Sequence, residues 1–295
     1  MLLTSLLSVA AAATSLAYPL SSTNGTNTTY IGPENGHLVV IGGNLQSVSI
    51  YEKIIELARG PDAPLVVIPT AGGEATYSNN FTTAVAFRRW GATNVTVLHT
   101  YDLARADTDD FVAPLKDAKG IFFGGGRQWR LVDAYAGTKA EAAFQGVLDR
   151  GGVISGSSAG ASIQGSFLVR GDTENNQVMI GDHKVGFGYL KNTAIDQHVL
   201  VRNRQFDMSQ ILKAYPDLLG VACDEDTALV INKNHMDILG TTYCLIYDGK
   251  FWSEEGSDLK QIPSPAHRFF FFWKPGDAYD LGERRALTNR TSTGR

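Results

Sequence analysis

The sequence predicts an α/β fold with a mostly parallel sheet, and two observations support that prediction. Short apolar runs such as residues 37–41, 65–68 and 120–123 alternate with segments of helical periodicity. Runs that are apolar throughout are typical of parallel strands that helices cover on both faces. Gly-rich turns follow several of these runs, so polar side chains are expected at the carboxyl edge of the sheet, where open α/β folds carry their sites.

The first half of the chain supplies the parallel strands and their helices. Residues 37–41 read HLVVI and end in Gly42-Gly43, and residues 65–68 read LVVI before a second Gly-containing turn. Apolar residues at helical spacing fill the segments between the strands. On this pattern we expect helices at 46–59, 80–90, 131–136 and 139–150, and further strands at 94–98, 120–123 and 153–154.

The last third of the chain has a different pattern, typical of antiparallel strands. The expected strands are 220–223, 228–231, 269–273 and the two arms, 242–247 and 250–252, of a β-hairpin that turns at Asp248-Gly249. No linker divides the chain. We therefore expect a single α/β domain over 37–285, with these hairpin additions at its C-terminal end, and a flexible tail at 286–295.

Length and composition restrict the class of protein. The 295 residues are enough for one large core, and 43% hydrophobic with 19% charged residues is typical of a well-packed globular chain. The formal net charge is −4 and no basic run is present, which argues against a nucleic-acid partner. After the N-terminal segment no apolar stretch approaches the roughly 18 residues that a membrane span needs, so no membrane partner is expected.

The N-terminus is typical of a secreted protein. Residues 1–17 are short and apolar and end in a small-x-small pattern before Tyr18, which predicts a signal peptide although Lys and Arg are missing from its start. A polar, flexible leader is expected over 18–36. N-glycosylation sequons support export through a eukaryotic secretory pathway, and they occur at Asn24, Asn27, Asn80, Asn94 and Asn289.

Two cysteines, Cys223 and Cys244, allow one disulfide in an oxidising compartment. Two buried free thiols are the equal alternative, since both residues stand in apolar, strand-like runs. Their spacing does not suggest a metal site, and we expect neither a metal nor an organic cofactor.

The most informative stretch is Gly156-Ser157-Ser158-Ala159-Gly160, which follows a short apolar strand. This Gly-x-Ser-x-Gly frame is typical of a nucleophile elbow, a strand-to-helix turn too tight for anything but small residues beside the serine. Such a turn exposes the Ser158 hydroxyl and places the backbone N–H of Ala159 where it can face a developing oxyanion. A second N–H is expected from Gly125 or Gly126, in a Gly-rich turn at the same sheet edge. An ordinary Gly/Ser/Ala-rich turn is the simpler alternative.

A nucleophilic serine needs a base, and the chain has six histidines. His198 is the best candidate because polar residues surround it: Asp196 and Gln197 precede it, and Arg202 and Arg204 follow it. The other five lie at strand ends or in polar turns and are better explained by structure or solvation. They are His37, His99, His183, His235 and His267.

Five ordered motifs resemble the cyanophycinase and dipeptidase E family of serine peptidases, and the likeness runs from about residue 38 to residue 252. They are Gly42-Gly43, Gly125-Gly126-Arg127-Gln128, the elbow at 156–161, Asp196-Gln197-His198 with Arg202 and Arg204, and Asp224-Glu225-Asp226-Thr227-Ala228. Five motifs in order are far more specific than any one of them. The Asp-Gln-His motif resembles the cyanophycinase branch.

The resemblance implies a flavodoxin-like three-layer sandwich, close to that of class I glutamine amidotransferases. It implies Ser158 as the nucleophile and His198 as the general base. Glu225 is the favoured acidic partner of the histidine, and Asp172 or Glu174 is the alternative. The family positions that surround the substrate correspond to Gln128, Asp196, Gln197, Arg202 and Arg204.

Departures from the family pattern bear on the substrate. Asp207 stands where cyanophycinases have a third arginine, Phe206 replaces a glycine, and Arg127 replaces Asn or Asp. Two remaining arginines suit a substrate carboxylate, whereas Asp196 or Asp207 could receive a basic group. We expect a secreted serine peptidase that hydrolyses peptide or isopeptide bonds and prefers β-aspartyl Asp-Arg units to α-peptides. The case for cyanophycin itself is weaker, and a homodimer is left open.

Two other functions stay open from the sequence. An α/β-hydrolase esterase also uses Gly-x-Ser-x-Gly and would take His267 as its base, but its His-Gly-Gly-Gly motif is absent upstream. A non-catalytic secreted binding protein could retain the same fold, although the presence of both Ser158 and His198 argues against it.

Overall fold

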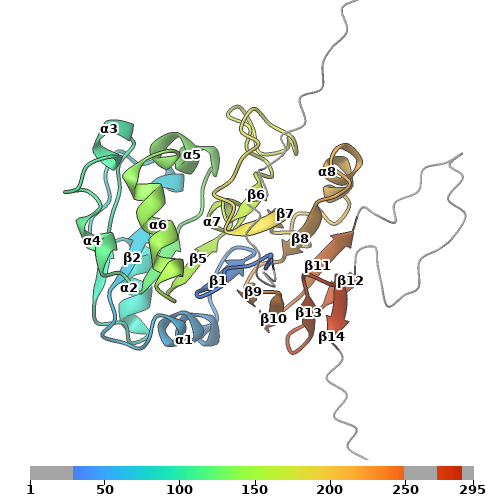
Figure 1. Ribbon diagram of the computed structural model, residues 1–295, viewed down its shortest axis with the longest axis horizontal. Coiled ribbons are helices and arrows are strands. Elements are labelled where there is room, and N and C mark those ends of the chain that lie inside the picture. The colour runs from blue at the N-terminus through green and yellow to red at the C-terminus, as the bar shows by residue number, and fades with distance from the viewer. Residues whose placement is uncertain (1–28, 249–270, 288–295) are drawn as a thin grey trace, which may run out of the picture.

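The computed structural model describes residues 29–248 and 271–287 (Figure 1). The expected signal peptide at 1–17, most of the leader, and Asn24, Asn27, His267 and Asn289 lie outside the described residues. Within the described part, the strands form a nine-stranded sheet and a five-stranded sheet. Figure 1 shows the helix-rich part of the molecule on the left and the strands of the C-terminal third on the right.

Parallel strands form one side of the larger sheet, in the order β1-β5-β4-β2-β3, with β3 at the edge. They are β1 (His37–Ile41), β2 (Leu65–Ile68), β3 (Val95–Val97), β4 (Gly120–Phe123) and β5 (Val153–Ser157). These predicted strands are confirmed, together with the α/β class and its mostly parallel sheet. Because parallel neighbours end at the same edge, the turns after β1, β4 and β5 lie near one another.

Helices cover both faces of this sheet: α1 (Val48–Leu57) and α2 (Thr82–Arg89) one face, α5 (Trp129–Tyr135) and α6 (Lys139–Asp149) the other. The first face carries Val39 and Ile41, and the second carries Leu38 and Val40. Alternate residues of one strand thus enter two different cores. Shorter segments complete the connections, namely η1 (Thr70–Gly72), α3 (Leu103–Ala106), α4 (Ala113–Lys116) and α7 (Ala159–Ser162).

The smaller sheet is parallel at one end and antiparallel at the other, in the order β12-β11-β8-β7-β6. It consists of β6 (Gly165–Phe167), β7 (Leu190–Gln197), β8 (Leu219–Cys223), β11 (Cys244–Asp248) and β12 (Phe271–Trp273). One face contributes Ile195 and Val221 to the same core as Leu38 and Val40 of the larger sheet. The other face packs through Ala194 and Ala222 against α8 (Met208–Ala214).

The larger sheet continues past β1 with antiparallel strands, and this extension corrects two predicted boundaries. The added strands are β9 (Thr227–Asn232), β10 (His235–Gly240), β13 (Ala278–Asp280) and β14 (Arg285–Leu287). Ala286 and Leu287 pair with β13 and do not form part of a flexible tail. Ile31 and Gly32, expected in the flexible leader, hydrogen-bond to Asn234 and Lys233 between β9 and β10. The folded region therefore extends beyond 37–285 at both ends.

β7 is the most important element that the sequence analysis did not predict. Asp196 and Gln197, for which no strand was expected, lie at the end of this strand. Its sequence LKNTAIDQ has no clear period, yet every residue from Thr193 to Gln197 is buried. The first arm of the predicted hairpin is observed as β11, which pairs with β8 and β12. Its second arm, 250–252, lies outside the described residues.

Candidate active site

Ser158 lies at the turn between β5 and α7, in a backbone conformation with φ 57° and ψ −113°. Two glycines make this turn possible. A Cβ on Gly156 would lie 2.1 Å from the carbonyl oxygen of Gly160, and a Cβ on Gly160 would lie 2.0 Å from that of Phe123. Both distances are far below van der Waals contact, so larger residues would force the turn open. The Gly-x-Ser-x-Gly spacing is thus a packing requirement of a strained serine.

The Gly-rich turn after β4 lies against Ser158. A Cβ on Gly125 would lie 3.4 Å from Ser158 Cβ and 3.9 Å from its Oγ. Gly126 has φ 139°, and a Cβ there would lie 2.0 Å from the carbonyl oxygen of Ala71. Because α7 has only four residues, stabilisation of an anion near Ser158 depends on individual N–H groups and not on a helix dipole.

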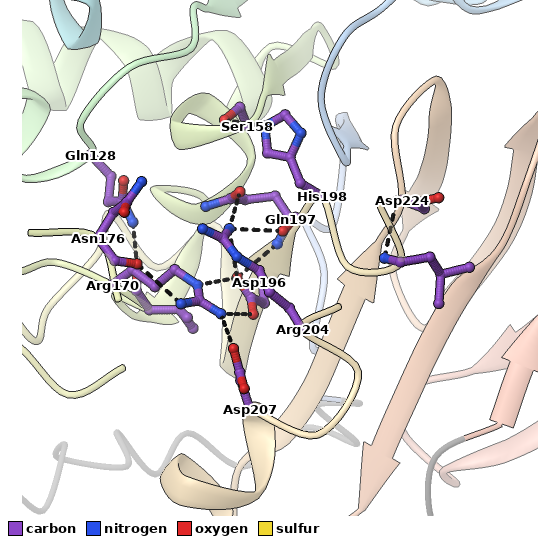
Figure 2. Close-up of polar contacts among 12 residues, drawn as sticks. Gln128, Ser158, Arg170, Asn176, Asp196, Gln197, His198, Arg204, Asp207 and Asp224 are labelled. Atoms are coloured by element: carbon purple, nitrogen blue, oxygen red, sulfur yellow. Dashed lines mark hydrogen bonds and ion pairs between the residues drawn. The ribbon is translucent and has the colours of Figure 1, made fainter. Parts of the chain in front are cut away.

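His198 follows β7 and connects Ser158 to an acidic residue. Its Nε2 lies 2.8 Å from Ser158 Oγ, and its Nδ1 lies 2.6 Å from Glu225 Oε1. Figure 2 shows the imidazole beside the serine. The backbone N–H of His198 donates to the carbonyl oxygen of Gly42 at 2.8 Å. A Cβ on Gly43 would lie 2.1 Å from His198 Cε1, so the ring can lie there only because the turn after β1 is glycine.

Glu225 lies in the turn after β8 and is held from two sides. Its Oε1 faces His198, and its Oε2 accepts a hydrogen bond from Asn44 Nδ2 at 3.0 Å. Because both ring nitrogens of His198 are engaged, neither Asp172 nor Glu174 is its acidic partner in this structure. The Asp172 carboxylate instead accepts the backbone N–H of Glu174, within its own loop.

Burial lowers the pKa of His198 below its usual 6.5. Desolvation is the largest cause, because removing the ring from water penalises the imidazolium. The hydrogen bond to Glu225 opposes this decrease in pKa, whereas the positive charges of Arg202 and Arg204 add to it. The imidazole is therefore neutral at neutral pH, the state in which it can accept a proton.

Three of the predicted substrate-binding residues, Gln128, Gln197 and Arg204, have hydrogen-bond partners within the chain, and Gln128 Nε2 donates to the carbonyl oxygen of Val169 at 2.5 Å (Figure 2). Arg204 Nη1 donates to the main-chain and side-chain oxygens of Gln197 at 3.1 and 2.9 Å. All three side chains are buried, and desolvation is the main reason that the pKa of Arg204 falls to about 10. The guanidinium still carries its charge at neutral pH. Arg202, two residues before it, is exposed.

Asp196 is not open to a substrate, which corrects the prediction that it could receive a basic group. Its carboxylate accepts Nε and Nη2 of Arg170 at 2.9 and 3.0 Å, and both side chains are almost completely buried. Arg170 Nη2 also donates to Asp207 at 2.7 Å. The two acids thus neutralise an arginine of this chain, as a buried guanidinium requires.

Arg170 is the residue of this region that the sequence analysis missed. It has no exposed surface, and it also donates to the carbonyl oxygen of Asn176, which ties the loop after β6 to β7. A signal was present in the sequence. Arg170 ends the apolar run Phe167-Leu168-Val169. A charged side chain next to such a buried run has to be paired with acidic or polar groups inside the protein.

Cys223 and Cys244 are joined by a disulfide at directly opposed positions of β8 and β11. The structure thus contains the bridge and not the two free thiols that the sequence also allowed. It lies one residue before Asp224-Glu225, so the cross-link anchors the chain just ahead of the acidic partner of His198.

Other features of the described residues bear on location and ligands. Asn80 and Asn94 are both exposed, as glycosylation of their sequons requires. Over the ranges that the structure covers, no helix has the length and apolar character to cross a bilayer. The same ranges hold no cluster of three or more His, Cys, Asp or Glu side chains arranged for a metal ion.

Comparison with known proteins decides the family. The profile of peptidase family S51 matches residues 38–239. The chain belongs to peptidase family S51. Cyanophycinases from Geminocystis herdmanii and Synechococcus elongatus are 29% and 30% identical to this S51 peptidase. The two matches cover 73% and 83% of its chain and 82% and 79% of the relatives.

Solved structures share the fold of this S51 peptidase. A peptidase from an acI-B1 actinobacterium matches with a TM-score of 0.61 at 23% identity, over 84% of this chain and 98% of the other. A putative peptidase E from Listeria monocytogenes EGD-e matches with a TM-score of 0.51 at 15% identity, over 70% and 99%. At these identities the likeness concerns the fold alone, and it agrees with a flavodoxin-like α/β sandwich.

Family membership makes this chain a serine-type peptidase of the cyanophycinase and peptidase E kind. It sets aside the α/β-hydrolase esterase and the non-catalytic binding protein. The base that the esterase would have used, His267, lies outside the described residues.

Proposed function

We propose that this S51 peptidase cleaves its substrate through an acyl-enzyme formed on Ser158, with His198 as the general base and Glu225 as the acid that orients it. One observation carries the proposal. Hydrogen bonds of 2.8 and 2.6 Å connect Ser158 Oγ through the imidazole to the carboxylate of Glu225. Acyl transfer needs a nucleophile, a base and an orienting group within this reach of one another.

In the acylation step, Ser158 Oγ attacks the scissile carbonyl carbon while His198 Nε2 accepts the hydroxyl proton. The carbonyl oxygen becomes an oxyanion, and its proposed donors are the backbone N–H groups of Ala159 and of Gly125 or Gly126. The imidazolium then gives its proton to the leaving nitrogen, the C–N bond breaks, and the amine product departs. Glu225 accepts the Nδ1–H hydrogen bond throughout and stabilises the imidazolium.

Water completes the reaction by hydrolysing the ester on Ser158. His198 removes a proton from the water, whose oxygen attacks the acyl carbon. The proton then returns to Ser158 Oγ as the C–O bond breaks and the acid product leaves. The lowered pKa of His198 suits both halves of the reaction, because the base has to be neutral at the start of each.

The proposed substrate class is a β-aspartyl isopeptide with arginine on the leaving side. Relatives named cyanophycinase support this class. In a β-linked Asp-Arg unit, the arginine α-carboxylate is free and lies one carbon from the scissile nitrogen. Arg202 and Arg204 carry positive charge suited to that carboxylate, and Arg202 is exposed. Asp196 and Asp207 have no part in this recognition, because Arg170 already occupies them.

Matched dipeptides test the substrate class. The kcat/KM for β-Asp-Arg should exceed that for α-linked Asp-Arg by about 10-fold or more. A site that places the β-carbonyl carbon next to Ser158 Oγ cannot place the α-carbonyl carbon of the other isomer equally well. β-Asp-Leu is the control that isolates the contribution of the arginine side chain, and cyanophycin tests whether the polymer enters the site. Equal rates on the α- and β-linked isomers would contradict the substrate class and leave the nucleophile unaffected.

Secretion and glycosylation form a further part of the proposal. The segment 1–17, the exposed Asn80 and Asn94, and the disulfide support it, since such bonds persist in oxidising compartments. In a eukaryotic host the mature chain should begin near Tyr18 and lose mass on deglycosylation. An intact, unglycosylated chain in the cytosol would contradict secretion.

A further inference from the structure

Three consecutive acids follow β8, and each engages a different part of the molecule. Glu225 faces His198. The Asp226 carboxylate accepts two backbone N–H groups at the start of α1, at 2.8 and 2.7 Å. The Asp224 carboxylate reaches the turn that follows His198. The reaction proposed above gives Asp224 no role.

Asp224 is buried and holds this turn with two hydrogen bonds. Its Oδ1 accepts the backbone N–H groups of Leu200 and Val201, both at 3.0 Å, and only 8% of the residue is exposed. Its Oδ2 accepts a longer hydrogen bond of 3.4 Å from the Thr242 hydroxyl. Hydrogen bonds to an ionised acceptor are stronger than those between neutral groups. Figure 2 shows Asp224 next to the backbone that leaves His198.

The turn needs such support because His198 itself has φ 53°. A non-glycine residue in the left-handed region persists only where its surroundings hold it. On one side of His198, the carbonyl oxygen of Gly42 accepts its backbone N–H. On the other side, Asp224 fixes the second and third residues after it.

Asp224 is itself anchored at the residue that precedes β11. Its backbone N–H donates to the carbonyl oxygen of Tyr243 at 3.0 Å, and the residue before it, Cys223, is cross-linked to Cys244. The acceptor that fixes the His198 turn therefore directly follows a strand that is covalently joined to its neighbour.

We propose that Asp224 is a positioning residue, whose carboxylate keeps the His198 imidazole between Ser158 and Glu225 by holding the turn behind it. This inference rests on the proposed role of His198 as the base. Asp224 contacts neither the substrate nor the reacting atoms. Without its carboxylate the turn relaxes, and the 2.8 Å contact between Nε2 and Ser158 Oγ is lost. A displacement of about 1 Å in a reacting group costs on the order of 10²-fold in rate.

The test compares three variants at a temperature at which all are folded. Asp224→Ala removes the acceptor, whereas Asp224→Asn keeps an oxygen that can accept both N–H groups. Asp226→Ala is the matched control, since it also removes a carboxylate with two backbone partners, but at the start of α1. Two readouts need no substrate. They are the rate at which a fluorophosphonate labels Ser158 and the downfield proton NMR signal of His198 Nδ1–H.

Asp224→Ala should slow labelling about 10- to 100-fold and shift or broaden the NMR signal. Asp224→Asn should label within about threefold of the wild type, and Asp226→Ala should lower Tm while its labelling rate stays within the same range. Asp224→Ser, whose short hydroxyl cannot reach both amides, replaces the alanine variant if that one does not fold.

Wild-type labelling in Asp224→Ala would overturn the positioning role, and so would equal losses in all three variants. An Asp224→Asn variant as slow as Asp224→Ala would do the same. Failure of the wild-type enzyme to be labelled would contradict the proposed nucleophile instead. The NMR signal would then decide the role of Asp224 by itself, because it reports the position of the imidazole without any reaction.

Discussion

Ser158 occupies a backbone conformation that its surroundings have to maintain, and its Oγ contacts the one base within hydrogen-bond reach among the described residues. Ser158→Ala should therefore lower kcat/KM by about 10³-fold or more, since oxyanion donors alone cannot form the covalent intermediate. Steady-state kinetics on the cleaved dipeptide measure the loss, and an unchanged Tm shows that the fold is intact. A variant with wild-type activity would locate the nucleophile elsewhere.

Charges around His198 determine how activity depends on pH. The base works when neutral, so activity rises as pH increases through its pKa, which burial places below 6.5. Arg202→Gln removes a cation that lowers this pKa and should move the acid limb of kcat/KM to higher pH. Glu225→Gln removes a group that raises the pKa and should move the limb to lower pH, besides lowering the rate.

A control and a contrary outcome complete the pH experiment. Lys116→Gln changes one exposed charge in α4 and should leave the acid limb where it is. If Arg202→Gln and Glu225→Gln move the limb in the same direction, the electrostatic account of His198 is wrong.

At the scale of elements, the turns after the parallel strands decide which side chains can meet. Gly43, after β1, has φ 138° and lies so close to His198 that a Cβ would overlap the ring. Gly43→Ala should lower kcat by about 10²-fold, because the imidazole has to move. Gly91→Ala is the matched control, since Gly91 also has a positive φ, 106°, but open space around it. If both variants lose the same amount of kcat, backbone strain explains the loss and the predicted displacement of the His198 ring is wrong.

Strands that are apolar throughout could be predicted from the sequence, and strands with buried polar residues could not. β1, β2 and β4 are buried along nearly their whole length, so almost every position in them requires an apolar residue. β7 escaped prediction because Asp196 and Gln197 are buried only by virtue of partners elsewhere in the chain. α3 and α4 have four residues each, too few to show a period.

The same distinction applies to the site. Ser158 and the glycines that shape its turn lie in one short window, so the local pattern is sufficient. His198 became the candidate base through its polar neighbours and Glu225 through the family resemblance, and only the folded chain shows which acid reaches the imidazole. The pairing of Asp196 with Arg170 could not be inferred, since nothing in the sequence distinguishes an internal cation from a substrate cation as its partner.

At the scale of the whole molecule, the disulfide joins the parallel part of the smaller sheet to its antiparallel part. Cys223 and Cys244 are 21 residues apart. Closing a loop of this length stabilises the folded state by about 3 kcal/mol through the entropy of the unfolded chain. The double variant Cys223→Ala, Cys244→Ala should therefore unfold at a Tm roughly 6–12 °C lower. Reductant should lower the Tm of the wild type and leave that of the double variant unchanged; equal sensitivity would contradict the prediction.

The proposed reacting groups are divided between the two sheets. Ser158 and Gly125 follow strands of the larger sheet, whereas His198 and Glu225 follow β7 and β8 of the smaller one. A folding intermediate that has formed only the larger sheet carries a serine with no base beside it, and one that has formed only the smaller sheet carries a base with nothing to activate. Hydrolysis through this proposed site therefore requires both sheets, and a copy that has formed only one of them is inactive.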